Sequence, residues 1–531
     1  AALRGRPVLI VGAGPAGLTA AIELIRRGVP VRCIDRAATP SGRSKALGIW
    51  PRTIELLRGM GGDDLLATRA SPQAEMRYYS SGRVVASLRF RTSTQPLICP
   101  QPDVEEILRD GLAAVGGRIE RGTELVRLEQ DPDGVTAWLR RKGAAERERF
   151  AYVIGGDGAS STVRSQLGVG FEGSTHEMDF VVADVDLDGP LEHDVTHYFC
   201  SPNGILVSTG LPSGRSRVFT SAPAGMDRNR VELATVQRLV DERGPGGLIL
   251  RDPEWLSVFS VHARHADRTR VGRVFLVGDA AHIHSPAGGQ GLNTGVTDAH
   301  NLAWKLALVW HGHAHTALLD SYETERGQVA RSVLRQADLQ TRIWLLRAPW
   351  QVALRDSALR TVSALRLLHL GYLPWLAGLR TTYPTVQRSR RAMDGFVPGA
   401  LVPAKPVRRP GSDLRAPLRS LLVGSGYTVL VVESAEPKAE TRAVLTTMTS
   451  ELSAVVAVRS LDRRTAILFD GARPAQLRRG RRSATVVLVR PDGHIDLRVA
   501  ERDVAAVRVR LNELFGPLLQ SQHTDSVKAR S

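Results

Sequence analysis

The chain has 531 residues, 43% of them hydrophobic and 24% charged, a composition typical of folded globular proteins and unlike disordered or fibrous ones. The formal net charge of +17 is spread along the chain, with the densest basic groups at 380–391 and 478–482. Because no basic run alternates with aromatic side chains, the charge indicates a solvated surface rather than a nucleic-acid interface.

Cysteine content and apolar runs bear on the compartment. Cys33, Cys99 and Cys200 form no Cys-x-x-Cys pair and no metal-ligand spacing, which fits a reducing, cytoplasmic environment. The longest apolar stretch, 365–379, is too short for a membrane span and contains Pro374. We therefore expect a cytoplasmic protein with neither a nucleic-acid nor a membrane partner.

The first predicted elements form one βαβ unit. The pattern is a short apolar strand, a glycine-rich turn, an amphipathic helix and a second strand, at 7–11, 12–17, 15–27 and 31–34. The glycines inside this run argue against a signal peptide, which the first residues superficially resemble.

The glycine-rich turn reads Gly12-x-Gly14-x-x-Gly17. Gly12 permits the tight turn, Gly14 lets the backbone approach a pyrophosphate, and Gly17 allows close packing of the helix. The helix N-terminus offers free N–H groups to phosphates, and Asp35 stands where an acid can accept from ribose hydroxyls. The unit predicts dinucleotide binding without separating NAD from FAD.

The middle of the chain changes pattern. Period-two alternation at 75–90, 179–187 and 204–222 predicts antiparallel strands. A buried strand at 274–277 enters a glycine-rich loop, and a long helix starts near Asn293. Residues 321–379 are helical in pattern, and 384–410 has the composition of a linker. β-like runs at 427–432, 454–458 and 484–489 predict a compact α/β unit at the end of the chain.

Two further motifs accompany the first. One reads Ile154-Gly-Gly-Asp157-Gly-Ala-Ser-Ser-x-x-Arg164, and the other Gly278-Asp279-Ala-Ala-His-x-x-x-Pro286-x-x-Gly289-x-Gly291-x-Asn293. Together with the glycine turn, and in this order, they resemble the single-component FAD-dependent aromatic hydroxylases of the p-hydroxybenzoate hydroxylase fold. The nearest branch is the one that hydroxylates phenols and aromatic polyketides and carries a thioredoxin-like C-terminal domain.

The resemblance implies an α/β fold with three parts. A Rossmann-like FAD-binding domain would comprise 1–73, 95–176 and 268–330. An interleaved antiparallel-sheet substrate domain would comprise 74–94, 177–267 and part of 331–390. A thioredoxin-like domain would comprise 391–531; because it has no Cys-x-x-Cys, dithiol redox chemistry is excluded there.

The resemblance also implies which residues hold FAD. Asp35 and Arg36 would hold the adenosine end, and Gln101 would reach the ribityl or pyrophosphate region. Asp279 would bind the ribityl chain, and the backbone from Pro286 to Asn293 would line the isoalloxazine ring. The complete set of expected cofactor-binding residues is Gly12, Gly14, Pro15, Ala16, Gly17, Asp35, Arg36, Lys45, Arg52, Gln101, Val126, Asp157, Gly278, Asp279, Pro286, Gly289, Gly291, Leu292 and Asn293. Lys45 stands where the family commonly has Arg, and Asp35 where Glu is commoner.

Arg52 and Pro286 are the candidate catalytic positions, both expected at the flavin face. For Arg52, a helix-surface role is an equally good interpretation. The His282-x-His284 pair could indicate a metal, but no carboxylate or thiol completes a site, so we expect none.

The implied reaction uses NADPH or NADH and O₂. Reduced flavin would form a C4a-hydroperoxide that hydroxylates a polycyclic aromatic small molecule in natural-product biosynthesis. Baeyer–Villiger oxygen insertion on the same fold is one alternative. A flavoprotein without redox turnover, such as a cyclase, is another. A monomer and a homodimer both fit the sequence.

Overall fold

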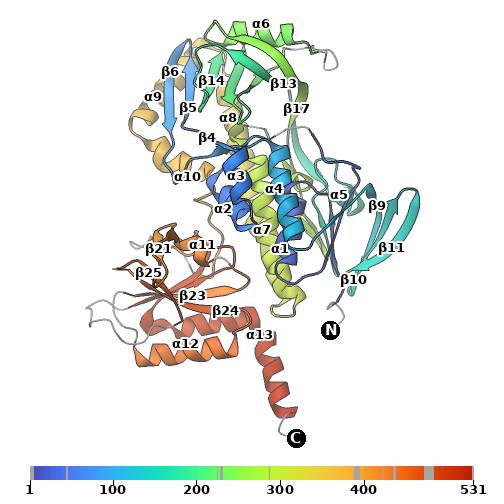
Figure 1. The fold of residues 1–531 in the computed structure, drawn as a ribbon, viewed down its shortest axis with the longest axis vertical. Helices are drawn as coiled ribbons and strands as arrows, with labels where there is room; N and C mark the ends of the chain where they lie inside the picture. Colours follow the sequence, from blue (N-terminus) through green and yellow to red (C-terminus); the bar gives the residue numbers. More distant parts are fainter. Residues whose placement is uncertain are drawn as a thin grey trace.

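The computed structural model describes residues 5–42, 46–223, 225–227, 231–285, 287–387, 395–422, 424–433, 438–463, 465–471 and 484–528, with the backbone alone at 174–178, 261, 287, 433 and 517–528. Figure 1 shows three parts. An antiparallel sheet lies at the top, a helix-covered parallel sheet in the middle, and a separate α/β body at the lower left.

The middle part is built on a six-stranded sheet with the order β18-β19-β12-β1-β2-β8. β1 pairs in parallel with β2 and β12, so the predicted βαβ unit and the strand before Asp157 lie side by side. The strands are β1 (Val8–Val11), β2 (Val31–Asp35), β8 (Ile119–Arg121), β12 (Tyr152–Gly155), β18 (Arg270–Val271) and β19 (Val274–Leu276). This arrangement confirms the predicted α/β fold class.

Helices and a small ribbon cover the two faces of this sheet. On one face, α1 (Pro15–Ile25) packs against α4 (Gln101–Ala114) and α7 (Gly291–Trp310) in a single apolar core. On the other face lies a three-stranded antiparallel ribbon, β9 (Thr123–Asp131), β10 (Gly134–Arg141) and β11 (Ala144–Phe150). The sequence analysis did not predict this ribbon, because its charged exposed face hides the alternation.

The upper part is an eight-stranded sheet with the order β20-β17-β13-β16-β15-β14-β5-β6. Its strands are β5 (Glu75–Ser80), β6 (Arg83–Arg89), β13 (Phe171–Asp188), β14 (Val195–Ser201), β15 (Gly204–Gly210), β16 (Ser216–Ser221), β17 (Ile249–Ala266) and β20 (His282–Ile283). The predicted antiparallel strands are confirmed.

The upper sheet is covered on both faces. α6 (Leu233–Arg243) packs on one face. The other face packs against residues of α8 (Asp320–Trp344), α9 (Pro349–Ala364), η4 (Leu368–Tyr372) and α10 (Leu373–Leu376). The long strands β13 and β17 run from this sheet down to the parallel sheet, as Figure 1 shows, so the two parts are continuous.

The lower body holds a seven-stranded sheet with the order β22-β21-β25-β24-β23-β26-β27. Its elements are β21 (Pro406–Arg408), β22 (Arg415–Pro417), α11 (Leu418–Leu422), β23 (Tyr427–Glu433), α12 (Ala439–Glu451), β24 (Val456–Asp462), β25 (Ile467–Asp470), β26 (Thr485–Val489), β27 (Ile495–Ala500) and α13 (Ala505–Lys528). The predicted linker 384–410 is too long. Phe396 and Val402 are buried in the core of this body, and β21 belongs to its sheet.

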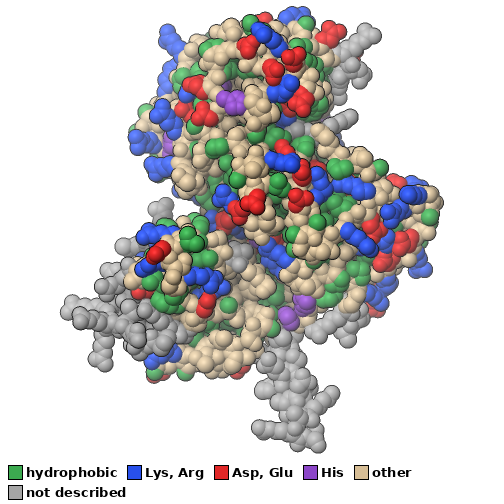
Figure 2. Space-filling view, viewed as in Figure 1, with side chains coloured by type: hydrophobic (Ala, Val, Ile, Leu, Met, Phe, Trp, Pro, Cys, Tyr) green, Lys and Arg blue, Asp and Glu red, His purple; other side chains and the backbone are tan. Residues whose placement is uncertain are grey.

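The surface agrees with the charge distribution along the sequence. Figure 2 shows basic and acidic side chains interspersed over the visible face. Among the described helices, none combines the length and the apolar character that crossing a bilayer requires.

Candidate functional site

The glycine-rich turn leaves open space at one position. A Cβ on Gly17 would lie 1.9 Å from the Gly12 carbonyl oxygen, and one on Gly12 would lie 2.4 Å from the Gly156 oxygen. At Gly14, the N-cap residue of α1, a Cβ would meet no atom within 4 Å. No acidic side chain stands in the first turn of α1 and no side chain caps it. The turn is therefore closed on the protein side and open where an anion would bind.

Asp35 supports this turn. Its carboxylate accepts from the Ala13 N–H at 2.7 Å and the Ala37 N–H at 2.8 Å, with Arg121 at 3.8 Å. Arg36 beside it is exposed, and Val126 on β9 is 42% exposed. These three predicted residues therefore lie at or near the surface, and Asp35 fixes the shape of the glycine turn.

Asp157 caps a helix. Its oxygens accept from the Ser161 hydroxyl at 2.6 Å and from the Val163 N–H at 3.1 Å, which orders the start of α5 (Thr162–Gln166). In the same motif, the Arg164 guanidinium donates to the Ala280 carbonyl at 2.9 Å and to Ala159 at 2.7 Å. These bonds hold the motif that contains Asp157 against the motif that begins at Gly278.

The third motif wraps around the first turn of α1. Gly278 has a φ of 58°, and a Cβ there would lie 3.0 Å from the Ala16 Cβ. Asp279 is exposed between the buried residues Gly278 and Ala280. Farther along, Gly289 has a φ of 61° and is exposed. Positive φ values of this kind favour glycine, so the motif reaches its place through conformations that other residues rarely adopt.

Asn293 joins the loop to a distant strand. Its side-chain nitrogen donates to Gly48 at 2.9 Å and to Gly289 at 2.7 Å, and its oxygen accepts from the Trp50 N–H at 2.9 Å. Gly291 and Leu292 begin α7, which also lacks a side-chain cap. Lys45 and Pro286 lie outside the described residues, and their predicted roles rest on the sequence alone.

The loop also carries the buried His282 and the partly buried His284. The His282 Nε2 donates to Asp298 at 2.6 Å. The His284 Nδ1 donates to the Ser285 carbonyl at 2.9 Å, and the ring lies 3.8 Å from where a Cβ on Gly291 would stand. Burial lowers the pKa of His284 to about 4, so this ring is neutral at pH 7. No group of three metal-ligating side chains occurs in the part of the chain that the structure describes.

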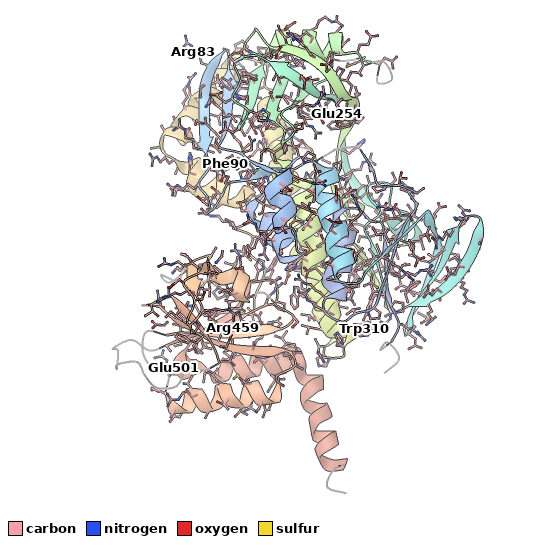
Figure 3. The ribbon with its side chains drawn as sticks, in the orientation of Figure 1. Arg83, Phe90, Glu254, Trp310, Arg459 and Glu501 are labelled. Atoms are coloured by element: carbon pink, nitrogen blue, oxygen red, sulfur yellow. The ribbon has the colours of Figure 1, made fainter. Side chains whose placement is uncertain are left out.

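An aromatic face of the upper sheet adjoins the loop through Trp50. Its indole N–H donates to the Gly288 carbonyl at 3.0 Å, and its ring meets Phe90 edge-on at 6.0 Å. Figure 3 shows Phe90 where the sheet meets the helices of the middle part. On the same face Phe180 stacks on Phe219 at 4.6 Å, and Phe219 lies 5.9 Å from the partly buried Phe259.

Two remaining predicted residues have other partners. Gln101 begins α4, and its side chain donates to Glu105 at 2.9 Å. Arg52, in α2 (Pro51–Gly59), is 5% exposed; it donates to the Asp492 carbonyl of the lower body at 2.6 Å and pairs with Glu55 at 3.1 Å. Arg52 therefore lies at the interface with the C-terminal body, and its expected position at the flavin face stays a prediction.

Comparison with known proteins places these motifs in one family. The model of the FAD binding domain family matches residues 6–337. The chain belongs to this FAD-binding family. The chain is 38% identical over 450 residues, 80% of its length and 79% of the relative's, to 6-methylpretetramide 4-monooxygenase of Streptomyces rimosus. It is an FAD-dependent monooxygenase of the branch that the sequence predicted.

Two solved structures show the range of the fold. The flavin-dependent monooxygenase PieE, in complex with FAD and substrate, superposes on this monooxygenase with a TM-score of 0.80 at 25% identity, covering 97% of this chain and 99% of PieE. The Diels-Alderase of pyrroindomycin biosynthesis superposes with a TM-score of 0.69 at 25% identity, covering 97% of this chain and all of that one. The fold thus serves oxygenation and, in that relative, a cyclisation.

The sequence analysis missed residues that hold the site together. Trp50, Asp298 and Arg164 contact the loop from three elements that are distant in sequence. Arg164 stood in a recognised motif but had no assigned role. No local pattern marks the contacts of the other two, because their partners are set by the packing of the loop against α7 and β3 (Gly48–Ile49).

Proposed function

We propose that this monooxygenase uses NADPH or NADH and O₂ to hydroxylate a polycyclic aromatic substrate of the polyketide type. The observation that carries the proposal is the position of Trp50. Its indole is bonded to the Gly288 carbonyl of the loop and packs on Phe90 at the aromatic face. The named relative, which acts on 6-methylpretetramide, supports the substrate class.

The residues present fit FAD. The Gly14 position has room for a pyrophosphate beside the uncapped N-terminus of α1, and Asp279 is exposed next to the buried Gly278. We propose that Gly12–Gly17, Asp35 and Arg36 hold the adenosine diphosphate half, with Gln101 and Asp279 along the ribityl chain. Gly289 to Asn293 would hold the ring, and α7 would present its N-terminus to the negative charge of the reduced flavin.

FAD, when bound, supplies the redox chemistry. The residues of the chain bind the substrate and orient it. We propose that Phe90, Phe219 and Phe259 stack against a planar substrate; each such contact is worth about 0.5–1.5 kcal/mol beyond the area it buries. The surrounding apolar cluster of Tyr78, Tyr198 and Trp344 excludes water from this face. The site lies between two parts of the molecule, where ligand sites commonly form.

Two further functions use the same fold. Baeyer–Villiger insertion would need a ketone instead of an electron-rich ring at the aromatic face. A cyclase without redox turnover is favoured by one observation, the structural similarity to a Diels-Alderase. Mass and regiochemistry of the product separate the first from hydroxylation, and flavin reduction separates the second.

The domain boundaries follow as part of the proposal. We assign 1–73, 95–176 and 268–330 to FAD binding and 74–94, 177–267 and part of 331–390 to the substrate. We assign 391–531 to the C-terminal domain, in whose core Phe396 is buried. A cytoplasmic location is proposed on the three buried free thiols.

The deciding experiment is anaerobic reduction of the bound flavin by NADPH and by NADH, with and without a panel of polycyclic phenols and ketones. We expect the yellow flavin band to bleach and one polycyclic phenol to accelerate the bleaching. A flavin that stays oxidised across the panel, together with an uncoloured cyclised product, would instead establish the cyclase.

A further inference from the structure

We propose that the C-terminal domain positions residues 278–284, called here the FAD loop, through a continuous network of buried side chains. In this network Tyr383 is the positioning residue that connects the C-terminal domain to Arg326 and Asp298. The inference rests on the placement of FAD at this loop, which belongs to the proposed function. It assigns a role to a domain that lacks cysteines altogether, since none follows Cys200.

The inner end of the chain is Asp298 on α7. Its Oδ2 accepts from the Gly278 N–H at 3.2 Å and from His282 at 2.6 Å, so one carboxylate oxygen holds two points of the loop. Asp298 is 1% exposed. Burial by itself would raise its pKa, but Arg326 and His282 hold the pKa below its ordinary value, which keeps the carboxylate ionised.

The middle of the chain is Arg326 on α8. Its Nε donates to Asp298 Oδ1 at 2.6 Å, and one terminal nitrogen donates to the Thr297 hydroxyl at 2.9 Å. The other terminal nitrogen donates to the Tyr383 hydroxyl at 2.9 Å. Arg326 is 3% exposed, so each of these bonds orients a guanidinium that has little access to bulk water.

The outer end lies in the C-terminal body. The Tyr383 ring is 4.2 Å from the His494 ring and 5.0 Å from the Arg490 guanidinium, and the Tyr383 N–H donates to Gly399 at 2.9 Å. Arg490 binds Glu325, the residue before Arg326 on α8, at 2.7 Å. The C-terminal body therefore contacts Glu325 of α8 directly, through Arg490, and the next residue, Arg326, through Tyr383.

Charge is balanced along this chain. Three cations, Lys305, Arg326 and Arg490, face three carboxylates, Asp298, Glu325 and Asp492, all of them buried. Buried charges of this kind are favourable only as a complete set, because removing one partner leaves another uncompensated. A shift of the C-terminal body would thus be felt at Arg326 and, through Asp298, at Gly278 and His282.

A second contact between the same parts provides the control. Arg419 of the C-terminal body pairs with Glu55 of α2 at 2.8 Å. In the described part of the chain, Glu55 pairs with Arg52 and Arg419, and Arg419 also donates to the Val402 carbonyl. None of these partners lies in residues 278–284, so this pair docks the domain without direct contact to the loop. Substitution of a residue that only holds the two domains together should have the same effect as substitution of Glu55. Substitution of a positioning residue should also change the hydrogen exchange of residues 278–284.

The test compares Tyr383→Phe, Glu55→Gln and Tyr427→Phe, the last a buried tyrosine inside the C-terminal body. Hydrogen exchange of residues 278–284 is measured in the FAD-free proteins, and the FAD dissociation constant in the same set. We expect Tyr383→Phe to speed exchange of the loop about tenfold and to weaken FAD binding about three- to tenfold. The two controls should lower Tm without either change.

Unchanged exchange in Tyr383→Phe would overturn the positioning role, as would an equal change in the two controls, which would indicate general loosening. Because exchange is read in the FAD-free protein, its outcome is independent of substrate oxidation. If the wild-type protein oxygenates no substrate of the panel, the proposed function is overturned, but the positioning role of Tyr383 is not.

Discussion

The two α/β units of this molecule use the N-terminus of their first crossover helix in different ways. At α1 the first turn carries no acid and no cap, and the Gly14 position is open. At α12 the N–H of the N-cap residue, Lys438, is bound by the buried carboxylate of Glu501. The difference separates a helix end that is left for an external anion from one that the chain satisfies itself.

The largest expected effect comes from filling the open helix end. Gly14→Val adds a side chain where no atom lies within 4 Å, so the apoprotein should fold with an unchanged Tm. FAD binding should weaken at least about 100-fold because the side chain occupies the pyrophosphate position. Absorbance at the flavin band and a melting curve of the apoprotein measure both.

Gly17→Val is the matched variant. Its Cβ would lie 1.9 Å from the Gly12 oxygen, so it should lower Tm strongly as well as release FAD. A Gly14→Val protein that keeps its yellow colour would contradict the assignment of the open helix end.

A smaller effect is expected from the pH response of the C-terminal unit. Burial lowers the pKa of His494 to about 4 from an ordinary value of 6.5. The unfolded state then binds the proton that the folded state does not, so stability falls as the pH drops from about 6.5 to about 4. His494→Asn should remove up to about 3 kcal/mol of that fall, measured by urea unfolding at both pH values.

Glu55→Gln should change stability in a different pH range. Burial alone would raise the Glu55 pKa, but Arg52 and Arg419 lower it to about 2. The stability that this group contributes is present above about 4.5 and is lost below, so the variant should leave the slope between pH 6.5 and 4.5 unchanged. An equal slope in wild type and His494→Asn would mean that the other histidines with lowered pKa values, His197, His284 and His300, account for the whole response.

The smallest effect should come from the occupied helix end. Glu501→Gln removes the negative charge beside the N-terminus of α12 and should cost about 0.3–1 kcal/mol of stability, visible as a small loss in Tm. FAD affinity should not change, because Glu501 and the α1 turn have no contact. A change in FAD affinity of tenfold or more would contradict the conclusion that the N-terminus of α1, and not that of α12, takes part in FAD binding.

The sequence marked the expected FAD-binding residues more clearly than the residues that contact them. Gly12, Gly14, Gly17 and the loop through Asn293 stood out because glycine requirements of the backbone are local and recur at fixed spacing. Arg52 shows the opposite case. Its side chain donates to the Asp492 carbonyl, 440 residues away, and no local pattern marks a partner at that distance.

What the sequence by itself determined is the α/β fold class, the FAD-binding motifs and the exclusion of dithiol chemistry in the C-terminal domain. Only the tertiary structure decided that Asp157 caps a helix, that Trp50 links the loop to the aromatic face, and that Arg326 and Tyr383 join the loop to the C-terminal domain. The physical reason is the sequence separation of the interacting residues. Strand period, helix starts and glycine turns are set by neighbours in the chain. The partners of buried charged and aromatic side chains are set by whichever distant residues the packing brings within hydrogen-bond reach.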